Sequence, residues 1–323
     1  MDLVPAVRLV RKALFADRVP RVQSMASMRR REALAAYLFI APTFIFFIVF
    51  IAGPMLFSLG LSLFEWDVIS EPVFAGLGNY QTILTDPRIL NSFRNTGLFV
   101  VLVLALDVVI ALGLTVALQQ KMPALLRSFF RTAFFVPVVT SITSVSIMFS
   151  FLLHRELGIV NYYLGQFGVD KVPWLVSSSW ALVSLAIVTV WKTFGFDLLL
   201  FIAGINNIPR HLYESAALDG ANGWQKFRWI TLPLLSPTIF FVLVIGLISN
   251  LQMFDQSYIM TKGGPGDSTK TIVMLIYEDS FGALRLGYGS AIAVILFLII
   301  FALTILQFRF SRRWVHYETG DAL

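Results

Sequence analysis

The sequence contains no cysteine and only three histidines. Without cysteine the chain has no disulfide, no thiolate metal ligand and no thiol nucleophile. The histidines His154, His211 and His316 lie far apart, and none has the His-Glu-x-x-His spacing of a zinc enzyme. No Gly-x-Ser-x-Gly elbow is present either. We therefore expect neither an enzyme nor a metal protein.

Charged residues are also scarce, at 14% of 323 positions, whereas hydrophobic residues make up 57%. An average soluble domain has about 25% charged and about 45–50% apolar residues. A water-soluble globule does not easily cover so much apolar surface. Runs of about 20 apolar residues are long enough to cross a hydrocarbon core about 30 Å thick. The composition indicates a polytopic membrane protein.

Six segments have the length and hydropathy of a membrane crossing. They lie near residues 36–63, 93–118, 130–152, 180–204, 233–254 and 287–308. The prediction is an all-α fold with about six transmembrane helices, in which internal prolines such as Pro137 can kink a span. Residues 33–315 form the predicted transmembrane domain, and residues 1–32 and 316–323 form cytoplasmic tails. A short amphipathic surface helix remains an alternative to disorder for the first tail.

The distribution of lysine and arginine predicts which side of the membrane each loop occupies. With six spans both termini lie on one side, and 17 of the 25 basic residues fall on that side. Six lie on the opposite side, Arg94 is at a boundary and Lys192 is inside a span. Because cytoplasmic loops are enriched in basic residues, both termini are predicted to be cytoplasmic.

The longest predicted inner loop, between the fourth and fifth spans, has the signals of a short helix. Pro209 suits the first turn, Asn207 can cap it, and Gly220 can adopt the positive φ that ends it. These signals predict a helix of about eleven residues. Its small residues, Ser215, Ala216 and Ala217, leave room for another protein to approach the backbone.

The second half of this loop predicts another short helix. Trp224, Phe227 and Ile230 recur every three residues, which places an apolar edge against the membrane interface. Leu232 and Pro233 then start the fifth span. A loop of this kind joins a cytoplasmic partner to two transmembrane helices through few joints, so we expect it to act as a coupling device.

This loop resembles the signature loop of binding-protein-dependent ABC importer permeases. That pattern is Glu-Ala-Ala, three residues, Gly, nine residues, Ile, one residue, Leu-Pro, and Ser215 here replaces the first alanine. The matching positions are Glu214, Ala216, Gly220, Ile230, Leu232 and Pro233. Over residues 36–315 the chain is similar to the larger membrane subunit of maltose and glycerol-3-phosphate importers, in pairs such as Trp191-Lys192 and in Gly263-Gly264-Pro265.

The resemblance implies a type I ABC importer permease in the bacterial plasma (inner) membrane. It implies a docking surface for an ATP-binding subunit that also includes Ala217 and Asp219. The implied partners are a second homologous permease subunit, two ATP-binding subunits and an external solute-binding protein, with no nucleic acid. ATP and Mg²⁺ would be bound by the partner subunits, and this chain would bind no cofactor. The implied solute is a sugar, a polyol or a glycerophosphate.

Charged groups inside the predicted spans cost about 2.5–3.5 kcal/mol each and need partners. Lys192 and Asp197 are about 140° apart on one helix, so their partners are expected on other helices. Polar and aromatic residues of the fourth and fifth spans are candidates for the solute path. They are Lys192, Asp197, Asn250, Gln252, Phe254 and Asp255. The alternative for Asp107 is a role in helix packing alone, and the alternative for Asp255 is a place at the membrane interface.

Three further expectations concern an alternative function and two segments outside the predicted spans. The alternative function is an ion-coupled secondary transporter or channel that uses Asp107, Lys192 or Asp197 as a relay. The segment 263–270 contains glycine, serine, threonine and lysine but lacks Gly-Lys-Ser/Thr, so we interpret it as a flexible external turn. Residues 77–90 have helical apolar spacing and predict a short surface helix.

Overall fold

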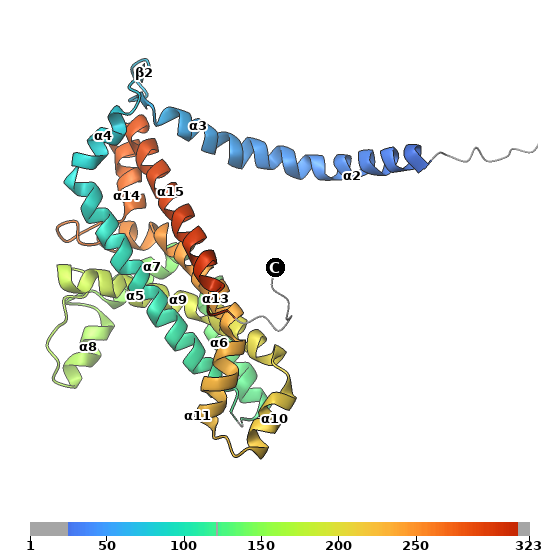
Figure 1. The fold of residues 1–323 in the computed structure, drawn as a ribbon. Helices are drawn as coiled ribbons and strands as arrows, with labels where there is room; N and C mark the ends of the chain where they lie inside the picture. Colours follow the sequence, from blue (N-terminus) through green and yellow to red (C-terminus); the bar gives the residue numbers. More distant parts are fainter. Residues whose placement is uncertain (1–24, 121, 316–323) are drawn as a thin grey trace, which may run out of the picture. The chain divides into compact units, whose positions relative to one another are not determined.

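The computed structural model describes residues 25–120 and 122–315, which divide into two compact units (Figure 1). The boundary falls between Phe57 and Ser58, and each unit is described by itself. The predicted tail segments 1–24 and 316–323 lie outside the described residues. Residues 25–32, which we also assigned to the tail, begin the helix that continues into the first predicted span.

The first unit is one long apolar helix whose hydrogen-bond pattern changes near its end. It contains α2 (Met25–Phe47), the π-helix η1 (Ile48–Ala52) and the start of α3 (Gly53–Leu61). Pro54 has no amide hydrogen, and the turn before it is widened, so that the Gly53 N–H donates to the oxygen of Ile48. Residues 32–61 are long and apolar enough to cross a membrane.

The second unit is helical except for one small hairpin. Its elements are β1 (Phe64–Glu65), β2 (Val73–Phe74), α4 (Gly78–Thr85), α5 (Pro87–Leu118), α6 (Ala124–Val139), α7 (Ile142–Leu152), α8 (Ile159–Gln166), α9 (Ser178–Asn207), α10 (Arg210–Leu218), α11 (Gly223–Lys226), η2 (Phe227–Thr231), α12 (Leu232–Leu234), α13 (Ser236–Leu251), η3 (Ser257–Thr261), α14 (Ile272–Tyr277), η4 (Glu278–Gly282) and α15 (Leu286–Ser311).

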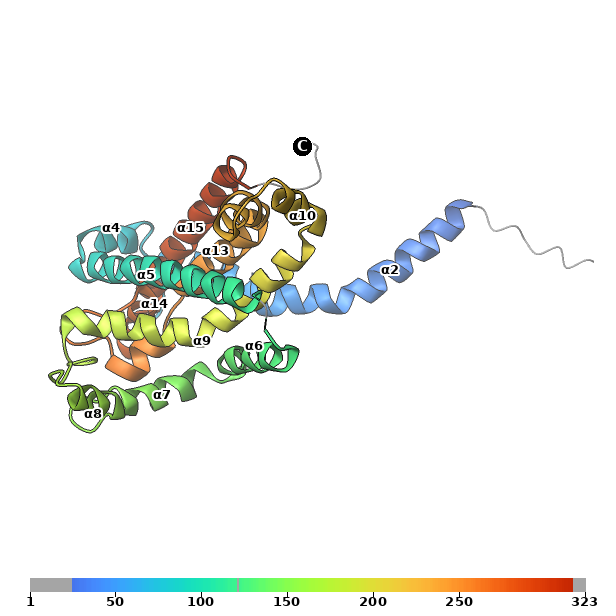
Figure 2. The ribbon, with the colours of Figure 1, turned by 90° about the horizontal axis from the view of Figure 1, so that it is seen from below.

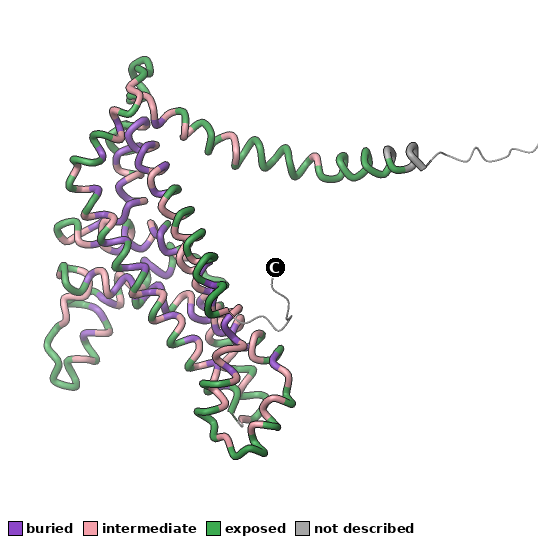
Figure 3. The backbone as a smooth tube through the Cα atoms, viewed as in Figure 1, coloured by how far each residue is buried: buried purple, intermediate pink, exposed green. Residues whose placement is uncertain are grey.

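Helix α9 is the centre of the second unit. Figure 2 shows α9 between α5 on one side and α6 and α7 on the other. Phe99, Leu198 and Phe201 are fully buried in the core that these helices share. At Gly195 a Cβ would lie 1.9 Å from the Phe134 carbonyl oxygen, so glycine is what permits the close approach of α6 and α9. Figure 3 shows buried residues along α5, α9 and α14.

Two of the six predicted spans are broken rather than continuous. Helices α6 and α7 meet at 100°, and the segment Gly223–Leu234 meets α13 at 61°. Proline lies near each break, at Pro137 and Pro233, and a hydroxyl three residues later donates to that proline's own carbonyl oxygen. Thr140 Oγ1 donates to the Pro137 oxygen and Ser236 Oγ to the Pro233 oxygen, each at 2.5 Å. Four described helices are long and apolar enough to cross a membrane, and counting each bent pair as one span gives six.

The end of the unit that carries α4 is closed by side-chain hydrogen bonds. Strands β1 and β2 pair antiparallel, with Phe64 opposite Phe74. Nδ2 of the buried Asn79 donates to the carbonyl oxygens of Ser62 and Phe64, both at 2.9 Å. Helix α4 confirms the first part of the short helix predicted at 77–90, whereas residues 87–90 belong to α5. Asp86 then caps α5, so this span begins at Pro87, six residues earlier than predicted.

The predicted flexible turn at 263–270 is a hydrogen-bonded loop instead. Asn95 Nδ2 donates to the oxygens of Asp267 and Lys270, at 2.7 and 3.1 Å. Lys270 Nζ also forms ion pairs with Asp267 at 2.8 Å and Glu278 at 3.0 Å. Burial lowers the pKa of Lys270, but the hydrogen bonds to these carboxylates outweigh it and raise that pKa above its usual value. No local pattern marks this anchoring, because Asn95 lies on α5, far from the loop in sequence.

An ionic network joins the first turns of α5 and α15. Asp86 accepts from Arg88 Nη2 at 2.6 Å and from the Tyr288 hydroxyl at 2.9 Å. Asp279, almost fully buried, accepts from Arg88 at 3.4 Å and pairs with Arg285. The hydrogen bond from Arg88 outweighs burial and lowers the pKa of the Asp86 carboxyl below its usual value of 3.8.

We expect Asp86→Asn to destabilise the protein at pH 7, by about 1 kcal/mol. A carboxyl whose pKa is lower in the folded state contributes stability at neutral pH and loses it as the pH falls through that lowered value. The difference in melting temperature between wild type and Asp86→Asn should therefore close on acidification below about pH 4. Thermal unfolding in nanodiscs measures it. Asp67, which only closes its own loop through Ser70, is the control, and an equal effect of Asp67→Asn would contradict the prediction.

Candidate functional site

The loop between the fourth and fifth predicted spans forms the predicted short helix, with shifted ends. Helix α10 has nine residues rather than about eleven. Asn207 does not cap it but ends α9, because a residue before proline is excluded from helical geometry and Ile208 is therefore the extended one. Pro209 is the N-cap residue, and the helix begins at Arg210.

The end of α10 is formed as the sequence predicts. Gly220 has φ +79°, which disfavours any residue with a Cβ. This conformation lets the Gly220 N–H donate to the Ala217 oxygen at 3.1 Å and the Ala221 N–H to the Ala216 oxygen at 2.8 Å. These bonds satisfy carbonyls that a helix end leaves unpaired.

The second predicted helix is also present, as α11 followed by η2. Asn222 and Gln225 form a capping box, with bonds of 2.9 and 2.8 Å, that starts α11. The rings of Trp224 and Phe227 lie 5.6 Å apart, as expected for residues one turn apart. Pro233 lacks the N–H that an α turn requires, and the preceding turn is a π turn.

The nine residues predicted to dock fall into two groups. Figure 3 shows α10 exposed or half-buried along its whole length, and none of its residues is buried. The exposed group consists of Glu214, Ser215, Ala217, Asp219 and Gly220, with Ala216 half-buried. Ile230, Leu232 and Pro233 are half-buried in the helical segment that leads into α13. The first group can contact a partner, and the second connects that contact to the bundle.

One side-chain contact that the sequence analysis missed ties the two halves of the loop together. The Tyr213 hydroxyl lies 2.9 Å from Thr231 Oγ1, and Thr231 is buried. This contact joins α10 to the segment before α13. No motif marks it, since the two residues are 18 positions apart and of ordinary type.

Two of the charged residues inside the predicted spans, Lys192 and Asp107, have uncharged hydrogen-bond partners on neighbouring helices. Lys192 Nζ donates to the Val138 oxygen at 3.3 Å, near the break between α6 and α7. Asp107 is 3% exposed and accepts from Thr193 Oγ1 at 2.8 Å, which joins α5 to α9. Among the described residues Lys192 and Asp197 form no ion pair with each other, in agreement with their predicted angular separation.

Four of the predicted path residues lie in one segment at the end of α13 and just after it: Asn250, Gln252, Phe254 and Asp255. Asn250 is mostly buried and donates to the Gly246 oxygen at 2.8 Å, whereas Gln252 is exposed. Asp255 is half-buried. The ring of Phe254 stacks on that of Tyr258, with centroids 5.1 Å apart. An amide, a carboxylate and an aromatic face thus occur within six residues, a set suited to a hydroxyl-rich solute.

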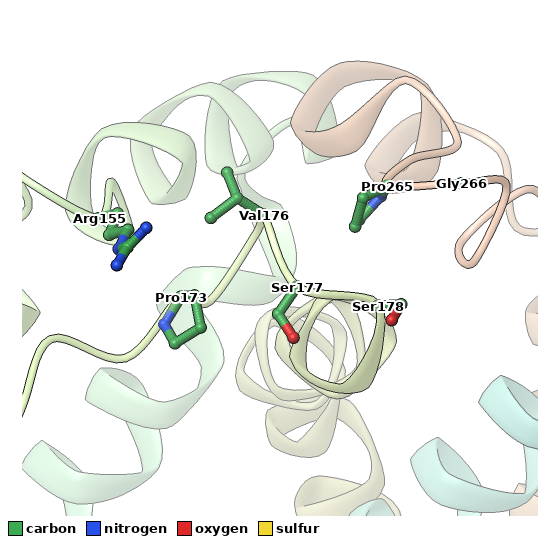
Figure 4. Close-up of a pocket in the computed structure, with 7 residues that line it drawn as sticks. All are labelled: Arg155, Pro173, Val176, Ser177, Ser178, Pro265 and Gly266. Atoms are coloured by element: carbon green, nitrogen blue, oxygen red, sulfur yellow. The ribbon is translucent and has the colours of Figure 1, made fainter.

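A cavity of about 620 Å³ opens where α9 begins, at the end of the unit opposite α10. Figure 4 shows Ser177 and Ser178 at the start of α9, with Arg155 on one side and Pro265 on the other. Pro173, Val176 and Gly266 complete the lining. The anchored loop 263–270 therefore forms one wall of a hollow that contains none of the predicted path residues.

Comparison with known proteins shows that this chain is similar to the membrane components of transport systems. A family described as binding-protein-dependent transport system inner membrane component matches residues 109–316, which include α10. A probable ABC transporter permease protein, YurN of Bacillus subtilis, is 35% identical over 88% of this chain and 98% of its own length. The sn-glycerol-3-phosphate transport system permease protein UgpA of Agrobacterium fabrum is 33% identical, over 91% of this chain and 100% of its own.

A solved structure has the same fold. It is a bacterial alginate ABC transporter in complex with an alginate pentasaccharide-bound periplasmic protein. The matching chain has a TM-score of 0.79 and 25% identity, and the match covers 90% of this chain and 98% of that chain. The likeness therefore extends over nearly the whole membrane bundle.

We expect Tyr213→Phe to loosen α10, because it removes the hydroxyl contact to Thr231 while keeping the ring. A net hydrogen bond is worth about 1 kcal/mol, so amide hydrogen exchange in α10 should become about fivefold faster. Mass-spectrometric exchange in nanodiscs measures this. Tyr163→Phe, on the exposed ring of α8, is the control. Unchanged exchange in α10 of Tyr213→Phe would show that the contact does not hold this helix.

Proposed function

The chain belongs to the family of binding-protein-dependent transport system inner membrane components, and from that premise we propose that α10 is where separate ATP-binding subunits move it. The chain is the membrane-embedded permease subunit of an ABC importer. The observation that carries the proposal is a short, mostly exposed helix with three small residues in succession, Ser215, Ala216 and Ala217, placed between two spans and without a buried residue of its own.

The charge distribution supports an inward orientation of α10. Helix α15 runs from the end that carries α4 toward the end that carries α10 and α11 (Figure 1). Arg309 near the end of α15 is therefore on the same side as Arg210, Lys226 and Arg228. Basic residues concentrate in the cytoplasm, so we infer that this end and both termini are cytoplasmic.

Movement of α10 would pass into the bundle by two routes. Ile208 and Pro209 connect α10 directly to α9, and the Tyr213–Thr231 contact connects it to the segment before α13. Helix α9 packs against α5 and α6, so a tilt of α9 reaches most of the unit. In the cycle that we propose, ATP closes the motor subunits, α10 moves with them, and the path opens outward. Hydrolysis then resets it.

The proposed assembly has several chains. A second, homologous permease subunit forms the path together with this one, two ATP-binding subunits bind ATP and Mg²⁺, and an external solute-binding protein delivers the solute. The match to a transporter crystallised with a periplasmic protein supports the last partner. The permease itself has no part in the chemistry of ATP hydrolysis.

The proposed solute is a sugar, a polyol or a glycerophosphate. The relatives include a transporter seen with an alginate pentasaccharide and a glycerol-3-phosphate system. The amide, carboxylate and aromatic groups between Asn250 and Asp255 suit such hydroxyl-rich molecules. The alternative of a self-sufficient ion-coupled transporter is set aside, because it leaves α10 without a role and Asp107 is accounted for by its bond to Thr193.

We expect Glu214→Lys to reduce uptake by the reconstituted transporter at least about tenfold, because reversing a charge at a docking surface places like charges or an unpaired charge in the contact. Uptake of labelled solute into proteoliposomes and co-purification of the ATP-binding subunits measure the effect. Glu71→Lys is the matched control, since Glu71 is an exposed glutamate in the loop after β1, at the opposite end. Normal uptake and co-purification with Glu214→Lys would refute the docking role.

A further inference from the structure

After α13, Phe254, Tyr258 and Tyr277 form a triangle of contacting aromatic rings that Phe281 extends from Tyr277, and we call these four rings the aromatic row. The centroid of Phe254 lies 5.1 Å from that of Tyr258 and 5.2 Å from that of Tyr277. Tyr277 is 5.4 Å from Tyr258 and 5.6 Å from Phe281. Three of the rings are exposed, at 42% for Tyr258, 39% for Tyr277 and 67% for Phe281. The rings therefore contact one another and still leave surface open.

The backbone beneath the row is held by buried hydrogen bonds. Gln256 Nε2 donates to Thr189 Oγ1 of α9 at 3.0 Å, and Ser257 Oγ donates to the Thr269 oxygen at 2.6 Å. Thr271 Oγ1 donates to the Met253 oxygen at 2.8 Å. Every one of these bonds is buried. They fix the row from behind, which is the preorganisation that a binding surface requires.

Both segments that carry the row contain a π-helix. Tyr258 lies in η3, Tyr277 directly precedes η4, and Phe281 lies within η4. A π turn is rare and occurs frequently at functional sites, because the extra residue redirects the side chains around it. The presence of two π turns at one aromatic row independently indicates that the row has a function beyond packing.

The row continues the predicted solute path. Asn250, Phe254 and Tyr258 follow one another at intervals of four residues, and the row then passes to α14, which lies toward the external end (Figure 1). Polar groups border it: Gln252 is exposed, Asp255 is half-buried, and Glu278 forms an ion pair with Lys270. Carboxylates beside the rings are unfavourable against lipid tails and favourable beside water and hydroxyl groups.

We propose that Phe254, Tyr258, Tyr277 and Phe281 are a stacking track for the pyranose rings of a saccharide that enters the path from outside. This inference rests on the proposed function. An aromatic face carries partial negative charge and attracts the C–H groups of a sugar ring, while tyrosine hydroxyls hydrogen-bond its hydroxyls. Several weak, equivalent contacts allow a solute to bind and still move on, as conduction through a selective path requires.

The test uses the full transporter in proteoliposomes, with its binding protein and ATP, and labelled lactose, maltose and sn-glycerol 3-phosphate as probes. The double variant Tyr258→Leu/Tyr277→Leu keeps apolar bulk but removes two ring faces. We expect it to raise the KM for pyranoside uptake about tenfold and to leave glycerol 3-phosphate uptake within about twofold of wild type. Tyr258→Phe/Tyr277→Phe, which keeps both faces, should stay within about threefold for the pyranosides.

The control is Tyr162→Leu/Tyr163→Leu, an exposed tyrosine pair on α8 in edge-to-face contact with centroids 5.4 Å apart, which should leave uptake unchanged. Wild-type kinetics for pyranosides in Tyr258→Leu/Tyr277→Leu, or an equal loss for glycerol 3-phosphate, would overturn the track. A wild-type transporter that moves only glycerol 3-phosphate would also overturn the track, but it would leave the proposed importer function intact. A wild-type transporter that moves none of the three probes would overturn the proposed solute class and the track with it.

Discussion

A helix without buried residues of its own has to be positioned from its two ends, and the rest of this structure depends on how that is done for α10. Ile208 is extended because proline follows it, and this fixes the start. The positive φ of Gly220 and the capping box at Asn222 fix the end. Tyr213 adds one contact to the segment before α13. The surface of α10, the proposed docking surface, stays open because contacts at its two ends and at Tyr213 set its position.

The opposite end of the second unit, in contrast, is held together by many side-chain contacts of its own. There the loops are tied to the helices by buried amides and hydroxyls, and Asp86 and Asp279 connect the first turns of α5 and α15 through arginines. Between the two ends, a hydroxyl group donates to a proline carbonyl oxygen near each helix break, as a membrane environment requires. In the cycle that we propose, α10 acts on a bundle whose opposite end is closed, because it is attached through α9 and through the segment before α13.

The sequence predicted the number of spans, the two loop helices and the positive φ of Gly220, because each depends on local chemistry. It did not predict the breaks at Thr140 and Leu235 as breaks, because a proline in a span shows where a helix can bend and not how far. The anchoring of 263–270 and the Tyr213–Thr231 contact were also missed. Both join residues distant in sequence, and such pairings are set by the tertiary packing alone.

The most direct measurement uses the absence of cysteine in the chain. A single cysteine introduced by Ala217→Cys is exposed on α10 and can be cross-linked in membrane vesicles that contain the whole transporter. The account predicts cross-links to the ATP-binding subunits, with a yield that changes when ATP is bound and hydrolysed. Labelling of this cysteine by an impermeant reagent from outside the cell, without any cross-link to those subunits, would contradict it.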